Sequence, residues 1–219
     1  MLEVTYPVNL LTEVEDKWGW EPERGAEFSV KSTYRTVAKL TEPMIEFSVN
    51  LIWNCPAPSK VSEFVWQLLH GRIPTRNNLI SRRMLAVDGD RSCVMCDEAA
   101  ETELHLFVYC EVASLVWMEI FHWLDAPFYF PHNLVSIFHC LIEFGSKKVR
   151  KGMVMICCVV LWTLWRCRNF ILFDNGTGTV MELVDKIKVS SWKWWISRSK
   201  AANCLLYEWR MEPWLCLGR

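Results

Sequence analysis

The chain has 219 residues, a formal net charge of −1 and a hydrophobic content of 52%, including 13 tryptophans. This composition excludes an intrinsically disordered protein and predicts either one large folded domain or two small ones. The first residues lack a basic segment followed by an apolar one, so we expect no secretory signal peptide and an intracellular protein, in the nucleus or the cytoplasm.

The first predicted element is a small β-hairpin. Trp18–Trp20 and Glu27–Lys31 have short alternating patterns on either side of a turn at Pro22–Gly25. The following residues, Ser32–Val37, are predicted to lead into a helix. We assign this hairpin and helix to an N-terminal segment, residues 1–45.

Two helices are predicted next. The first opens at Pro58–Lys60, has apolar residues at helical spacing and ends near Gly71; these residues are Val61, Phe64, Val65, Leu68 and Leu69. Thr75 is placed to cap a second, short helix with Leu79 and Ile80 facing inward. Arg76, Arg82 and Arg83 are then predicted on its outer side.

The most informative motif follows these helices. Cys93, Cys96, His105 and Cys110 form a C-x2-C-x8-H-x4-C array. Three thiolates and one imidazole at this spacing can close a tetrahedral shell around one Zn²⁺. Four protein ligands leave no open position for a water molecule, so the predicted zinc is structural and not catalytic. A disulfide is the alternative for Cys93 and Cys96, and core packing is the default for the other cysteines: Cys55, Cys140, Cys157, Cys158, Cys167, Cys204 and Cys216.

The rest of the chain is predicted to be helical. An amphipathic stretch, Ala113–Trp123, completes a zinc-binding module over residues 46–125, and Pro127 and Pro131 mark a linker. The C-terminal region, residues 126–219, contains helical segments at Val135–Phe144, Met153–Phe173 and Met181–Ile196. The uncharged run Met153–Trp165 has 13 residues, fewer than the roughly 20 that a bilayer requires, so we predict a buried helix and no membrane contact. The predicted fold is mainly α with a small N-terminal hairpin.

Basic side chains are concentrated in two parts of the chain. Residues 60–91 contain six bases and three acids, and residues 146–200 contain eleven bases and three acids. Basic stretches with interspersed aromatic residues can bind a phosphate backbone while rings stack on bases. A solvated basic face is the alternative interpretation.

The order of residues resembles a known family. One set of residues resembles the zinc-binding domain that follows the polymerase in plant LINE-type (non-LTR) reverse transcriptases. These residues are Trp53, Pro56, Pro58-x-Lys60, Phe64-x-Trp66, Gly71-Arg72-x-Pro74-Thr75, Leu79 and Arg82, then the cysteine and histidine array and Trp117. Trp162-Thr-Leu-Trp165-Arg-x-Arg168-Asn169 resembles the link to the ribonuclease H region of those proteins. The resemblance implies that Cys93, Cys96, His105 and Cys110 are zinc ligands and that the module binds nucleic acid during reverse transcription.

Catalytic motifs are missing from the sequence. A polymerase requires paired carboxylates that hold two Mg²⁺ ions, and no Tyr-x-Asp-Asp-like turn occurs. Asp88-Gly89-Asp90 is interpreted as a surface turn, and no spaced set of acids suggests a ribonuclease H site. We therefore predict that the chain is not an enzyme.

Two functional hypotheses remain open. In the first, the module binds RNA or DNA through bases on the helices that precede the zinc loop: Lys60, Arg72, Arg76, Arg82 and Arg83. The alternative contact in this hypothesis is the basic group of Lys147, Lys148, Arg150 and Lys151. The loop itself, residues 93–111, contains five acids and no base, so it is expected to repel a phosphate backbone. In the second, exposed tryptophans dock a reverse transcriptase or ribonuclease H domain. A non-functional retroelement remnant is a third alternative.

Overall fold

The computed structural model describes residues 29–33, 46–86, 88–142, 145–198 and 204–218. The chain divides into two compact units, Met1–Pro43 and Met44–Arg219. In the first unit, residues 30–33 form a helical turn, because the Ser29 hydroxyl oxygen accepts the backbone N–H of Ser32 at 3.1 Å. Val30 and Lys31 are therefore helical, and their assignment to a strand was wrong. The rest of the predicted hairpin lies outside the described residues.

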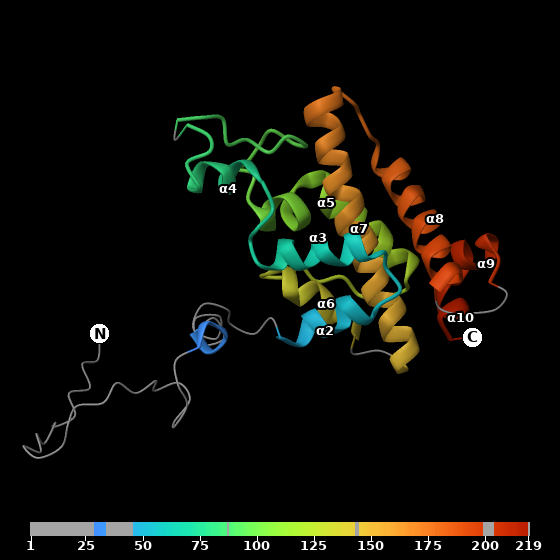
Figure 1. Ribbon diagram of the computed structural model, residues 1–219. Coiled ribbons are helices and arrows are strands. Elements are labelled where there is room, and N and C mark those ends of the chain that lie inside the picture. The colour runs from blue at the N-terminus through green and yellow to red at the C-terminus, as the bar shows by residue number, and fades with distance from the viewer. Residues whose placement is uncertain (1–28, 34–45, 87, 143–144, 199–203, 219) are drawn as a thin grey trace, which may run out of the picture. The chain divides into compact units, whose positions relative to one another are not determined.

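The second unit is built from helices (Figure 1). In chain order they are α2 (Glu46–Asn54), α3 (Ser59–Leu69), α4 (Arg76–Ser81), the π-helical turn η1 (His105–Tyr109), α5 (Glu111–Trp123), α6 (Leu134–Ile142), α7 (Lys147–Asp174), α8 (Val180–Arg198), α9 (Leu206–Met211) and α10 (Pro213–Gly218). The described residues contain no β-sheet, and their one isolated β-bridge pairs Ser92 with Ala100. The prediction of a mainly α fold is confirmed.

Helix α7 is the centre of this unit. Residues 153–161 are at most 1% exposed, and α2, α3, α6, α8 and α10 pack around them. Ser146 caps the helix by accepting the backbone N–H of Val149, so α7 begins six residues before the predicted start at Met153. By length and composition α7 could cross a membrane, but 56% of its most apolar stretch is buried inside the protein. The structure therefore confirms the buried helix, and the lack of membrane contact stays a prediction.

Local sequence signals explain α3 and α4. Gly71 follows the end of α3 with a φ of +62°, a left-handed conformation that glycine adopts without strain. The Thr75 side chain accepts the backbone N–H of Asn78 at 3.3 Å and caps α4, as predicted. On the buried face of α3, the Phe64 ring lies 5.3 Å from that of Trp162 and 5.8 Å from that of Trp165. These contacts anchor α3 on α7, so the module and the C-terminal region share one core.

The two last helices, α9 and α10, were not predicted individually. Trp209 of α9 is fully buried, with ring centroids 6.0 Å from Trp123 and 6.2 Å from Trp195. Cys204, which precedes α9, and Cys216, which lies within α10, form a disulfide with a Cα–Cα distance of 5.6 Å. Both cysteines are buried in the core, as predicted, but their pairing was not predicted; the α9–α10 turn returns the chain and brings the two sulfurs together.

Candidate metal centre

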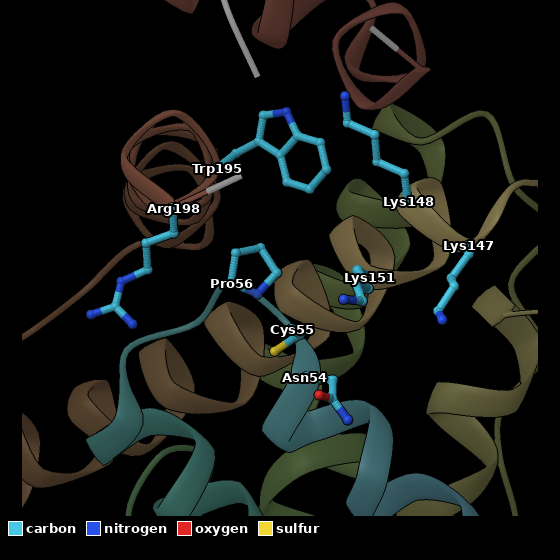
Figure 2. Close-up of a pocket in the computed structure, with 8 residues that line it drawn as sticks. All are labelled: Asn54, Cys55, Pro56, Lys147, Lys148, Lys151, Trp195 and Arg198. Carbon is cyan, nitrogen blue, oxygen red and sulfur yellow. The ribbon is translucent and has the colours of Figure 1, made fainter. Parts of the chain in front are cut away.

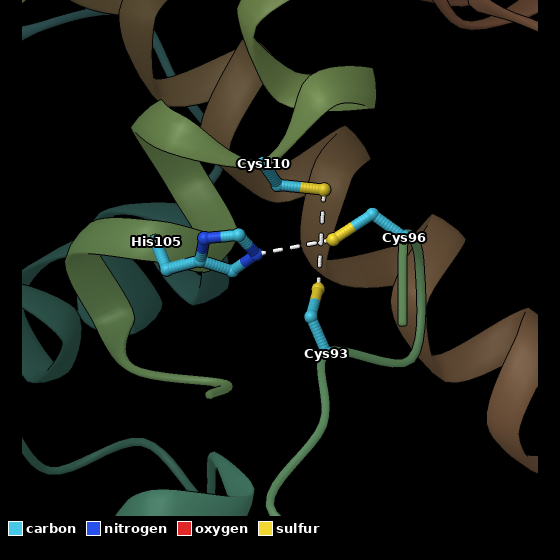
Figure 3. A group of neighbouring side chains, drawn as sticks. All are labelled: Cys93, Cys96, His105 and Cys110. Atoms are coloured by element: carbon cyan, nitrogen blue, oxygen red, sulfur yellow. Dashed lines mark hydrogen bonds between the residues drawn. The ribbon is translucent and has the colours of Figure 1, made fainter. Parts of the chain in front are cut away.

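The first two cysteines lie in a tight turn between Ser92 and Ala100, the two residues of the isolated bridge. The Cys93 N–H donates to the Ala99 carbonyl at 2.7 Å, and the Asp97 N–H donates to the Cys93 carbonyl at 2.7 Å. Asp97 closes the turn with a φ of +58°, a left-handed conformation that aspartate tolerates better than most residues. The turn thereby holds Cys93 and Cys96 on the same side of the loop (Figure 3).

The other two members of the cluster are positioned by the π-helical turn. The Cys110 N–H donates to the His105 carbonyl at 2.7 Å, an i to i−5 bond. Phe107, between them, is fully buried, and its carbonyl accepts the Trp117 indole N–H at 2.7 Å. A π-helical turn widens the helix by one residue, so His105 and Cys110 lie one turn apart and face the same point.

The four side chains converge as a zinc site requires. Their ligand atoms all lie within 4.8 Å of one another. The sulfurs of Cys93 and Cys110 are 3.9 Å apart, and the Cys96 sulfur is 3.3 Å from Nε2 of His105 (Figure 3). A tetrahedron with Zn–S bonds of about 2.3 Å and a Zn–N bond of about 2.0 Å has S–S edges of about 3.8 Å and S–N edges of about 3.5 Å. The donor set and its spacing therefore fit Zn²⁺.

The thiols at this centre are electrostatically coupled. The hydrogen bond with Cys110 lowers the pKa of Cys93 to about 5. The same bond, together with burial, raises the pKa of Cys110 above its ordinary value. The two buried sulfurs thus share one proton, and a cation bound between them would displace that proton.

A buried carboxylate supports the loop. Glu101 is fully buried, and its two oxygens accept from Arg168 Nη2 at 2.7 Å and from Arg168 Nε at 3.2 Å. They also accept the backbone N–H of Arg76 at 2.9 Å and of Val94 at 3.4 Å. One side chain thus joins the start of α4, the turn beside Cys93 and helix α7.

No local sequence signal indicates this role of Glu101. It is one of the five acids expected to make the loop repel phosphates, but it is buried and paired, so it adds no negative charge to the surface. Its partner Arg168 is 3% exposed and is marked in the sequence only as part of the family-like motif after Trp162. The partners are 67 positions apart in the chain, so no local pattern indicates the pair.

The five bases predicted to contact nucleic acid have different environments. Lys60, Arg72, Arg82 and Arg83 are exposed. The Lys60 amine lies 5.3 Å from the Trp162 ring centroid, and the Arg72 guanidinium lies 4.9 Å from that of Trp66. Arg76 differs, because it pairs with Asp90 and donates to the Ser92 carbonyl at 2.9 Å. Its head group therefore ties α4 to the zinc loop.

The acidic pair Asp88 and Asp90 lies in a surface turn, as predicted. Both residues are exposed, and the Gly89 N–H donates to the Ala86 carbonyl at 3.0 Å. Asp90 accepts the backbone N–H of Ser92 at 2.8 Å and its hydroxyl at 2.7 Å. These hydrogen bonds lower the pKa of Asp90 and explain its place in the turn.

Comparisons with known proteins agree with this geometry. Residues 28–117 match the family described as zinc-binding in reverse transcriptase. This match supports a zinc-binding domain of the reverse-transcriptase type in that part of the chain. The four cluster residues and the five predicted bases lie within the matched segment, whereas Arg168 lies beyond it.

One relative extends over most of the chain. An Arabidopsis thaliana protein named "Putative ribonuclease H protein" is 22% identical over 202 residues, which are 91% of this chain and 32% of the relative. The chain therefore spans about a third of the length of that relative. No solved structure matches the chain. Together, the family match and this relative confirm the predicted resemblance and fit an origin from a retroelement protein.

Proposed function

We propose that the chain is a nucleic-acid-binding module in which Cys93, Cys96, His105 and Cys110 hold one structural Zn²⁺. The observation that supports this most directly is the closed cluster of four protein ligands within 4.8 Å. A tetrahedral shell completed by protein leaves no site for a reactive water. The ion would supply cross-linking, because it would join the Cys93–Cys96 turn to η1 and to the start of α5.

The exposed bases near the zinc loop support binding to a phosphate backbone. Lys60, Arg72, Arg82 and Arg83 are available to solvent, and Lys60 and Arg72 each lie over a tryptophan ring. Bases beside aromatic rings can contact phosphates while the rings stack on nucleobases. The ligand is RNA or DNA, which implies a nuclear or cytoplasmic protein.

We further propose that the chain has no polymerase or nuclease activity by itself. The matched family is described as zinc-binding. The buried Glu101 is fully engaged by Arg168 and two backbone N–H groups, and Asp90 is engaged by Arg76 and Ser92, so neither acid is available to hold a catalytic metal. The relative's name refers to a protein two-thirds of which lies outside the aligned region.

An aromatic patch favours protein docking as a second candidate function. Tyr109 and Phe130 stack with centroids 6.0 Å apart and are 43% and 48% exposed, and the neighbouring Tyr129 is 70% exposed. Aromatic residues are enriched at the centres of protein interfaces. A reverse transcriptase or ribonuclease H domain is the partner that this alternative implies.

Binding measurements at several salt concentrations test the primary proposal. The zinc-loaded protein is titrated against labelled single-stranded and duplex oligonucleotides, and the variant Arg72→Gln/Arg82→Gln/Arg83→Gln is compared with it. Each phosphate interaction that the variant removes should make the slope of log affinity against log salt shallower by roughly 0.7 for single strands and 0.9 for duplex. Zinc content should not change, because none of the three is a ligand of the metal. An unchanged slope would remove these bases from the interface, and absence of binding would leave protein docking as the better function.

A further inference from the structure

A cavity of about 710 Å³ lies where the start of α7, the end of α8 and the α2–α3 connection meet (Figure 2). It is lined by Asn54, Cys55, Pro56, Lys147, Lys148, Lys151, Trp195 and Arg198. Four of these side chains are cations and none is a carboxylate. The cavity is therefore strongly positive, although the chain as a whole has a net charge of −1.

Two of these cations contact neutral groups. The Lys148 amine lies 6.0 Å from the Trp195 ring centroid, and Arg198 donates to the Ala57 carbonyl at 3.0 Å. None of the four takes part in an ion pair among the described residues. Lys148 and Lys151 are nevertheless partly buried. Partly buried cations without a counter-ion lose solvation that an anion in the cavity would restore.

The position of the lysines on α7 supports the same conclusion. Lys147, Lys148 and Lys151 fall within the first five residues of a 28-residue helix whose first turn contains no acid. The N-terminus of a helix bears a partial positive charge, so lysines there destabilise the helix, and acids are the residues that stabilise it. A bound anion reverses this effect, because it interacts favourably with both the lysines and the helix terminus.

We propose that this cavity is a binding site for phosphate groups. Its volume greatly exceeds that of one phosphate, and four cations can neutralise several negative charges, so the ligand presents two or more phosphates close together. Trp195 is only 1% exposed, and therefore cannot stack on a nucleobase; recognition is of phosphates and not of base identity. This site goes beyond the proposed function, because it contains none of Lys60, Arg72, Arg82 and Arg83.

Two sources of closely spaced phosphates are separated by experiment. Sodium tripolyphosphate represents a free polyphosphate, and a labelled single-stranded oligonucleotide represents a nucleic-acid strand. Both are titrated into the zinc-loaded protein and into Lys147→Gln/Lys151→Gln. The matched control is Lys186→Gln/Lys193→Gln, which removes the same charge from two exposed lysines of α8 that do not line the cavity.

The cavity variant should bind at least one probe about tenfold or more weakly, because two charge-assisted hydrogen bonds to phosphate are removed. The control should stay within about twofold of the unmodified protein, since its lysines are surface charges. Thermal melting gives a second, independent readout. Removing lysines from the start of α7 should leave the melting temperature unchanged or raise it. Lysines that only hold the fold would instead lower it.

The outcomes distinguish this inference from the proposed function. Loss of tripolyphosphate binding alone in the cavity variant supports the site and identifies a free polyphosphate as its ligand. Loss of oligonucleotide binding supports the site and identifies the strand. If the three proteins bind both the oligonucleotide and tripolyphosphate equally well, the cavity site is overturned and the proposed function stays intact. Failure of the unmodified protein to bind either probe overturns the cavity site, whereas the proposed function is overturned only if duplex oligonucleotides also fail to bind.

Discussion

The replacement of Arg168 by methionine tests how strongly the zinc loop depends on α7. Arg168 and Glu101 are 3% and 0% exposed and are joined by two hydrogen bonds, at 2.7 and 3.2 Å. Arg168→Met removes both bonds while it preserves much of the aliphatic packing. The Glu101 carboxylate then stays in the interior without its cation, which is the costly half of a broken buried ion pair.

The structure limits the size of this effect. Removing one partner of a buried ion pair destabilises a protein by about 3–5 kcal/mol. Two backbone N–H groups, of Arg76 and Val94, continue to donate to Glu101. We therefore expect the lower end of the range, about 3 kcal/mol of unfolding free energy. Zinc affinity should fall about tenfold, because Val94 adjoins the ligand Cys93 and the turn loses an anchor.

Urea denaturation of the zinc-loaded protein measures the change, with Arg166→Met as the matched control. Arg166 is exposed on the same helix, so its loss should change the unfolding free energy by no more than about 0.5 kcal/mol. If Arg168→Met were as stable as Arg166→Met, the buried pair would contribute nothing, and our account of how the loop is held would be incorrect.

Three further predictions concern the metal and the core. Cys96→Ser or His105→Ala should abolish the binding of one Zn²⁺ per chain and unfold the segment around residues 91–117, because zinc binding contributes on the order of 10 kcal/mol in small modules. Native mass spectrometry measures the bound metal. The control variant Cys167→Ser, which changes a buried thiol outside the cluster, should retain the metal. The raised pKa of Cys110 keeps its thiol protonated at neutral pH in the metal-free protein, so zinc must displace that proton and zinc affinity should rise with pH. Calorimetry in two buffers of different protonation enthalpy should detect proton release at pH 7. If no proton were released, the shared-proton arrangement of Cys93 and Cys110 would be contradicted. Gly152→Ala should destabilise the fold by about 1–3 kcal/mol despite the higher helix propensity of alanine, because a Cβ there would lie 2.2 Å from Leu217 Cδ2. Thermal melting measures this change. In the control Gly218→Ala the added Cβ meets nothing within 4 Å, so the melting temperature should not change.

Local patterns predicted those elements whose causes are local. The bounds of α3 and α4 follow from apolar spacing, from Gly71 and from the Thr75 cap, all of which lie within or beside the helices. The four cluster residues were predicted together because zinc ligands arise from short loops with typical spacing. The family resemblance agrees with both, since it depends on the same residues.

Features that depend on distant contacts were not predictable in this way. The Glu101–Arg168 pair joins residues 67 positions apart, and the lysine cavity forms only when three helices meet. Arg76 was predicted to face solvent, but it is held by Asp90, which lies 14 positions away. Helix α2 was not predicted either; its nine residues pack on α3 and α7, which are later in the chain. The Cys204–Cys216 disulfide requires the α9–α10 turn, which no sequence motif indicates.

The ion pair between Glu101 and Arg168 also determines which fragments of the chain keep the support of the metal site. The matched family segment ends at residue 117, whereas Arg168 and the Trp162 and Trp165 rings that contact Phe64 come later in the chain. A fragment that stops at residue 117 would expose the buried face of α3 and leave the Glu101 carboxylate unpaired. A retroelement copy truncated before α7 would therefore lose the support of its metal site together with its C-terminal region. The stretch of chain that supports the metal site, which includes α7, is therefore longer than the segment that matches the family.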